Sequence, residues 1–167
     1  MIGAINGPAV TGGLEISLSC DILLATPNTK FADTHARVGL VAGWGLSQRL
    51  SRVIGIYRAK EMSLTGNFMS AQQAYEWGLV NHVVPQGELM STAVSIAEDI
   101  LSCVPESMLA YKRMIDRGYD LSLGDAMMYE KEFNQVHSIP PPETVAGRRS
   151  DIQIRGREQA RRDENGV

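Results

Sequence analysis

The stretch AVTGGLEISLSC, residues 9–20, decides the fold of this chain, because it joins a short apolar segment to a helix through two consecutive glycines. Leu14 and Leu18 lie four positions apart, as residues on one face of a helix do. We therefore expect a helix that begins at Gly12 and ends near the end of this stretch, with a strand and a turn before it.

The start of this helix is a candidate site for an oxyanion. The N–H groups of a first helical turn have no partner inside the helix, and the helix dipole makes that end positive. Glycine lets a ligand carbonyl approach closely, so the Gly12 N–H is a candidate donor, with Glu15 beside it. The alternative is that the glycines only permit tight packing and that the dipole alone favours Glu15 at this position.

Apolar segments typical of strands lie on both sides of this helix. Residues 2–5 form one such segment, and residues 21–26 and 30–33 form two more, each bounded by turn residues. A strand at residue 2 has no earlier element to cover it, so it would leave a sheet edge open or require a partner chain. The sheet is expected to be short of strands.

The second half of the chain is predicted to be mainly helical. A helical pattern begins at Trp44, and the capping box SAQQ at residues 70–73 predicts a helix over 71–77, followed by a strand over 79–84. Three longer helices are expected near residues 87–103, 106–117 and 122–137. Prolines 140–142 break the pattern, and the arginine-rich tail after them is expected to be a solvated basic face, mobile at its end. The order of elements predicts an α/β domain with a helical extension.

Composition restricts the class of protein. The chain has 167 residues, 44% hydrophobic and 21% charged, which is typical of a globular domain. Its formal net charge of −3 gives no reason to expect a nucleic acid as its partner. Cys20 and Cys103 lie in apolar helical patterns and are expected in the core. No signal peptide, membrane span, metal-ligand spacing or redox-cofactor motif is recognised, so an intracellular protein without a metal is expected.

Many short motifs are similar to one known family. They are INGPA at 5–9, GGLE at 12–15, CDI at 20–22, FA at 31–32, Gly39, GLSQRL at 45–50, AKEM at 59–62, LTG at 64–66, SA at 70–71, GLV at 78–80 and VP at 84–85. Together they resemble the enoyl-CoA hydratase/isomerase (crotonase) family over nearly the whole chain to about residue 138. The string FADTHAR at residues 31–37 resembles a plant-type branch of that family.

The resemblance implies a crotonase (ClpP-like) fold of the α/β class. Residues 1–86 would be the C-terminal part of its β-β-α spiral core, residues 87–138 a helical region that oligomerises and closes the active site, and residues 139–167 a basic tail. The N-terminal part of the domain, with a second oxyanion N–H and much of the coenzyme A cradle, would be missing. We therefore expect the chain alone to be poorly active and to self-associate through its open sheet edge.

The resemblance also implies roles for individual residues. Gly12 is similar to an oxyanion-hole donor, Glu15 to the first catalytic glutamate, and Gly43 to a loop glycine that lines the site. The second glutamate of the usual hydratase is replaced by His35. A histidine can exchange protons near neutral pH, so Glu15 and His35 form a feasible acid/base pair. Alternatively, His35 only hydrogen-bonds Asp33 or a backbone carbonyl.

The function implied by the resemblance is addition of water to a 2-enoyl-CoA thioester, in fatty-acid β-oxidation or related acyl-CoA metabolism. Coenzyme A would be part of the substrate, with no separate cofactor and no metal, and the protein would be a homo-oligomer, a trimer or a dimer of trimers. The alternatives are an isomerase or decarboxylase that uses Glu15 alone, and a non-catalytic interaction module. Asp33 is a further acidic candidate, whereas Trp44 and Trp77 are expected to be packing residues. A eukaryotic protein of this kind would act in peroxisomes or the mitochondrial matrix, and a bacterial one in the cytoplasm.

Overall fold

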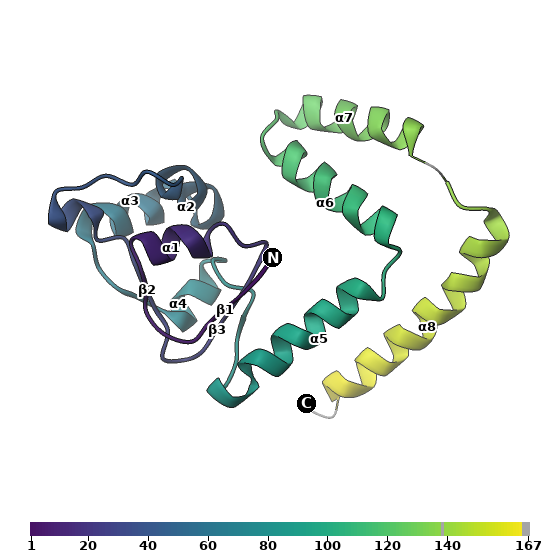
Figure 1. Cartoon of the computed structure of the whole chain (residues 1–167), viewed down its shortest axis with the longest axis horizontal. Helices are drawn as coiled ribbons and strands as arrows, with labels where there is room; N and C mark the ends of the chain where they lie inside the picture. Colours follow the sequence, from purple (N-terminus) through teal and green to yellow (C-terminus); the bar gives the residue numbers. More distant parts are fainter. Residues whose placement is uncertain (138, 165–167) are drawn as a thin grey trace. The chain divides into compact units, whose positions relative to one another are not determined.

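The computed structural model describes residues 1–137 and 139–164 and divides the chain into two compact units, Met1–Pro105 and Glu106–Val167 (Figure 1). The first unit holds every strand of the described residues together with the helices around them. The second unit is helical. No helix of the described residues is long and apolar enough to cross a bilayer.

The strands of the first unit form two small sheets. In one sheet, the central strand β3 (Ile22–Ala25) pairs in parallel with β1 (Ile2–Ile5) and with β6 (His82–Val83). In the other, β4 (Lys30–Ala32) pairs in parallel with β2 (Ala9–Val10) and antiparallel with β5 (Met69–Ser70). The strands predicted within residues 1–33 are therefore confirmed. The short strand that precedes Gly12 and Gly13 is β2.

The strand predicted over residues 79–84 is shorter than expected. β6 spans only His82–Val83, and the residue before it uses its side chain to continue the pairing. The Leu23 N–H donates to Oδ1 of Asn81 at 2.8 Å, and the Asn81 N–H donates to the Leu23 carbonyl at 2.8 Å. An amide side chain thus replaces one backbone bond of the ladder, which ends the strand early.

Helices α1 (Gly12–Ser17), α2 (Leu46–Ile54) and α3 (Ile56–Thr65) bury their apolar faces in one core. Leu14 of α1, Leu46 and Leu50 of α2 and Phe31 of β4 are at most 1% exposed. Because Leu14 lies one residue before Glu15, this packing fixes the short helix that carries the candidate glutamate.

The Ser70 half of the predicted capping box forms at α4 (Ala71–Glu76). The Ser70 side chain accepts a hydrogen bond of 3.1 Å from the Gln73 N–H, and Gly78 follows with φ of 81°. After the short 3₁₀ turn η2 (Gln86–Glu88), helix α5 (Leu89–Leu101) buries Leu89 and Ala93 against Leu24 of β3. Thus α5 packs within the first unit. The functional division of the chain at residue 86 stays a prediction.

The second unit contains α6 (Pro105–Tyr119), α7 (Leu123–Val136) and α8 (Pro142–Glu164). The first two agree with the predicted helices to within two residues, and Ser122 caps α7 by accepting from the Asp125 N–H at 3.2 Å. The basic tail after the prolines is helical from Pro142, an element that was not predicted there. Proline suits a first helical position, since its fixed φ matches the helix and its missing N–H would have no partner there. The expected mobility at the chain end falls on residues 165–167, outside the described residues.

Three packing predictions need correction. Cys103 is exposed rather than in the core, because it lies just beyond the end of α5, and Cys20 is only partly buried. Trp44 is 68% exposed, because it lies in the loop before α2. Trp77 does pack against the core, with the Arg58 guanidinium 5.1 Å from its ring centroid.

Candidate active site

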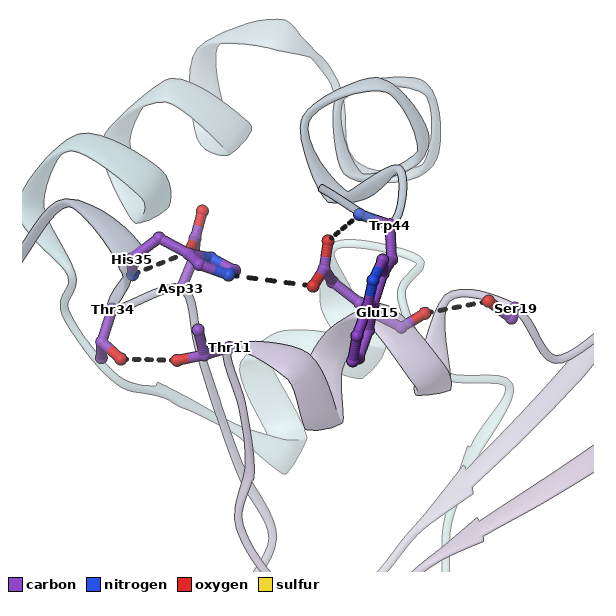
Figure 2. A network of polar contacts seen from close by, with 7 residues as sticks. All are labelled: Thr11, Glu15, Ser19, Asp33, Thr34, His35 and Trp44. Atoms are coloured by element: carbon purple, nitrogen blue, oxygen red, sulfur yellow. Dashed lines mark hydrogen bonds and ion pairs between the residues drawn. The ribbon is translucent and has the colours of Figure 1, made fainter. Parts of the chain in front are cut away.

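The parallel pairing of β2 with β4 brings two distant segments to one edge of their sheet. The chain leaves β2 at Thr11 and leaves β4 at Asp33, so both segments emerge side by side. The Thr11 N–H donates to the Ala32 carbonyl at 2.9 Å, and the hydroxyls of Thr11 and Thr34 lie 2.6 Å apart (Figure 2). These bonds fasten the start of α1 to the residues that follow β4.

Thr11 adopts a backbone conformation that side chains rarely take. Its φ of 55° makes it the one non-glycine residue with positive φ within residues 1–137 and 139–164, and its ψ is −111°. Such strain persists where surrounding bonds determine the conformation, and it gathers at functional sites. Here it turns the chain sharply from β2 into α1, which places Glu15 in the first turn of that helix.

The Glu15 carboxylate is hydrogen-bonded at one oxygen and faces His35 with the other. Its side chain is 4% exposed, and Oε1 accepts a hydrogen bond of 2.7 Å from the backbone N–H of Trp44 (Figure 2). The second oxygen, Oε2, lies 3.8 Å from Nε2 of His35. A buried carboxylate without partners would be costly, so these contacts explain how the group is accommodated inside the protein.

His35 is held from the other side by Asp33. It is the first residue of the 3₁₀ turn η1 (His35–Val38), and its Nδ1 lies 2.7 Å from Oδ1 of Asp33. The His35 N–H donates to the same oxygen at 3.2 Å, and both side chains are buried. One ring nitrogen of His35 therefore bonds Asp33, as one alternative predicts, and the other ring nitrogen faces Glu15. The acid/base role of His35 stays a prediction.

The structure brings Glu15, His35 and Asp33 into one buried row, with Gly12 close by. No described residue accepts a hydrogen bond from the Gly12 N–H, and a Cβ added at Gly12 would lie 3.5 Å from the Trp44 ring. A Cβ added at Gly43 would meet no described atom within 4 Å, so the role of Gly43 in the site stays a prediction.

Sequence reasoning missed three contributors to this site. The backbone of Trp44 orients Glu15, and the hydroxyls of Thr11 and Thr34 join the two segments. The glycines on either side of Trp44 are the one signal in the sequence that this backbone has a special conformation. Nothing local marks the threonine pair, because the two residues lie 23 positions apart.

The whole length from residue 1 to residue 140 matches the enoyl-CoA hydratase/isomerase family. The chain is 49% identical over 132 residues to the "Probable enoyl-CoA hydratase 1, peroxisomal" of Arabidopsis thaliana, covering 79% of this chain and 50% of that protein. It is 40% identical over 132 residues to the "Short-chain-enoyl-CoA hydratase" of Clostridium acetobutylicum, covering 79% of this chain and 51% of that protein.

A solved structure agrees with these sequence relatives. The crystal structure of an enoyl-CoA hydratase from Bacillus anthracis matches with a TM-score of 0.82 and 36% identity, over 91% of this chain and 58% of that one. The chain spans about half the length of the curated relatives it matches. It has the crotonase fold over that part, and it belongs to the enoyl-CoA hydratase/isomerase family.

Proposed function

We propose that this protein hydrates 2-enoyl-CoA thioesters. The observation that carries the proposal is the buried pair of Glu15 and His35, with Oε2 and Nε2 3.8 Å apart. Addition of water to an enoyl thioester needs one group to take a proton from water and another to give a proton to the α-carbon. Isomerisation needs only one such group, so a second titratable side chain facing Glu15 favours hydration.

The two residues take complementary roles in the proposed reaction. The proposed reaction starts with Glu15 as the carboxylate and with hydrogen on both ring nitrogens of His35. Glu15 Oε2 then takes a proton from water as the water oxygen bonds to C3, and His35 Nε2 gives its proton to C2. The proton on Glu15 afterwards passes to His35, which restores the starting state.

The electrons of the C2–C3 double bond move onto the thioester oxygen during this addition, and that oxygen needs hydrogen-bond donors. The family resemblance assigns one donor to the Gly12 N–H, which has no acceptor among the described residues. Loss of a single donor from an oxyanion hole costs about 2.7–4 kcal/mol of transition-state stabilisation. Gly12 would therefore supply a large share of the rate.

The substrate, location and assembly of the protein follow from the same proposal. The substrate is an acyl-CoA thioester whose coenzyme A is part of it, with no separate cofactor. The name of the Arabidopsis relative supports peroxisomes as one location, and the mitochondrial matrix or a bacterial cytoplasm are the others.

Assembly into a homo-oligomer, a trimer or a dimer of trimers, is supported by the second unit. Many large apolar side chains are exposed on α6 and α7, including Ile115, Tyr119, Met127 and Val136. Water-exposed apolar groups at this density are typical of surfaces that pack against another chain. Light scattering on the purified protein would give its mass, and a monomer at micromolar concentration would contradict the expected assembly.

Incubation of the natural gene product with crotonyl-CoA tests the function. We expect 3-hydroxybutyryl-CoA, measured by mass spectrometry in water labelled with ¹⁸O. Glu15→Gln and His35→Gln should each lower kcat by about 10²- to 10⁴-fold, the usual contribution of one acid/base group. Glu61→Gln, an exposed change on α3, is the matched control and should leave kcat unchanged.

Two outcomes would contradict the proposal. A 3-enoyl-CoA substrate converted to the conjugated 2-enoyl thioester, without hydration of crotonyl-CoA, would make the protein an isomerase. Unchanged turnover in His35→Gln would remove His35 from the reaction.

A further inference from the structure

We propose that Asp33 is the positioning residue of His35, and that its carboxylate fixes the imidazole ring and its tautomer so that Nε2 faces Glu15. The inference rests on the proposed use of His35 as an acid/base group. Asp33 itself would touch neither water nor thioester. Its effect would pass entirely through the ring of His35.

The geometry of the contact carries the first step. Oδ1 of Asp33 lies 2.7 Å from Nδ1 of His35, within normal hydrogen-bond range, and this contact is buried. An ionised carboxylate can only accept hydrogen bonds, so Nδ1 must carry the hydrogen. A neutral ring then has its lone pair on Nε2, and proton exchange takes place at Nε2, the atom that lies 3.8 Å from Glu15.

The charge of Asp33 is not explained by the turn that it forms. Its Oδ1 also accepts the His35 N–H at 3.2 Å, which is a turn of the kind that neutral asparagine makes equally well. The Asp33 side chain is 7% exposed, and an ionised carboxylate at such depth is costly unless it is paired. The group that it pairs with is the imidazole, so the charge serves the ring rather than the backbone.

The surrounding bonds keep this arrangement rigid. Thr34, between Asp33 and His35, is tied through its hydroxyl to Thr11 at the start of α1. Thr11 is in turn bonded to the end of β4 through its N–H. The segment that holds the His35 ring is thereby anchored to the helix that holds Glu15. By orienting the ring, Asp33 therefore also sets its position relative to Glu15.

The chemistry of the ring gives Asp33 a second effect. When His35 carries its proton, the ring is positive and stands between the carboxylates of Asp33 and Glu15, both of which attract it. Once His35 has given the Nε2 proton to substrate, Nδ1–H stays bonded to Asp33. The ring can therefore take a proton back at Nε2 without rotating.

Nitrogen NMR on the ¹⁵N-labelled chain tests the inference without relying on activity. The ring signals of His35 are assigned by their loss in His35→Gln, and those of His82 serve as an internal reference. At a pH where the ring is neutral, we expect the Nδ1–H tautomer in the wild type and a smaller share of it in Asp33→Asn, because a neutral amide oxygen accepts this hydrogen more weakly than a carboxylate does. An Nδ1–H tautomer that persists unchanged in Asp33→Asn would overturn the proposal.

Kinetics of the natural gene product give a second readout. We expect Asp33→Asn to lower kcat at least 10-fold with KM changed less than threefold, and to have no further effect when His35→Gln is already present. A purely structural role would lower kcat in both backgrounds, and that result would contradict positioning. A changed tautomer in Asp33→Asn, with no hydration by any variant, would support the positioning role of Asp33. It would also disprove the proposed function.

Two further variants keep the test decisive. Asp116→Asn, which removes an exposed carboxylate paired with Lys112, is the matched control and should leave both readouts as in the wild type. If Asp33→Asn does not fold, Asp33→Ser replaces it, because a serine hydroxyl can form the equivalent turn without charge. The same two outcomes then decide the proposal.

Discussion

The backbone N–H of Trp44 donates a hydrogen bond of 2.7 Å to Oε1 of Glu15, although the two residues lie 29 positions apart. The bond occupies one carboxylate oxygen and leaves the other to face His35. The glycine-rich loop before α2 is therefore part of the site through its backbone, while the exposed Trp44 ring lies beside Gly12.

A change at Gly45 should disturb this loop. Gly45 has φ of 98°, and an added Cβ would lie 3.4 Å from Nε of Arg49. We expect Gly45→Ala to lower the free energy of unfolding by about 1–2 kcal/mol, the usual cost of a side chain at positive φ. It should also lower kcat, because the Trp44 N–H moves away from Glu15. Urea denaturation and turnover of crotonyl-CoA measure the two effects.

Gly43→Ala is the comparison for that variant. Its φ is not positive and an added Cβ would meet no described atom, so the stability should match the wild type. If Gly43 lines the acyl site, KM should rise severalfold in this variant. An unchanged KM would remove Gly43 from the site.

The strain at Thr11 predicts an inverted order of stability between two variants. Thr11→Gly and Thr11→Ala both lose the hydroxyl that meets Thr34. Alanine usually stabilises relative to glycine by restricting the unfolded chain. At φ of 55° we expect the glycine variant to be more stable by about 1 kcal/mol, because only glycine adopts this conformation freely. Equal stabilities by urea denaturation would mean that this backbone is not strained.

Gly3 in β1 should not tolerate a methyl group. An added Cβ would lie 2.7 Å from Cδ2 of Leu23 and 3.0 Å from Sγ of Cys20. We expect Gly3→Ala to cost about 1–3 kcal/mol, as other overpacking changes do. Gly7→Ala, in the turn after β1 with no described atom within 4 Å of its Cβ, should change stability by less than about 0.5 kcal/mol. Fluorescence of Trp44 and Trp77, both in the first unit, follows the unfolding.

The cap of α4 should contribute measurably to stability. Ser70→Ala removes the acceptor of the Gln73 N–H, and we expect a loss of about 1 kcal/mol. Ser95→Ala, an exposed change within α5, is the control and should be neutral or slightly stabilising, because alanine favours helix interiors. Similar midpoints of denaturation for both variants would show that the cap contributes nothing.

Exposure of Cys103 predicts two rates of thiol modification. Cys103 lies beyond α5 and is exposed, whereas Cys20 packs partly against the core. We expect a thiol reagent to modify Cys103 at least 10-fold faster than Cys20 in the folded protein, and Cys103→Ser to remove the fast phase. One uniform rate for both thiols would contradict the difference in burial.

Local elements were predictable because their causes are local. The turn into α1, the cap at Ser70 and the helices of the second half depend on neighbours within a few positions, and these predictions are confirmed. The start of α8 at Pro142 was missed, since three prolines in a row indicate a break as readily as a helix start. The exposure of Trp44 was also missed, because composition favours burial of an aromatic ring wherever its loop lies.

The sequence by itself determined which side chains could carry chemistry, namely Glu15, His35 and Asp33, and it indicated the family through motifs along the chain. Only the tertiary structure decided that His35 faces Glu15 with one nitrogen while it bonds Asp33 with the other. The physical reason is that the parallel pairing of β2 with β4 brings together segments that no local pattern connects. The backbone bond from Trp44 occupies Oε1 of Glu15, so Oε2 is the oxygen that faces His35.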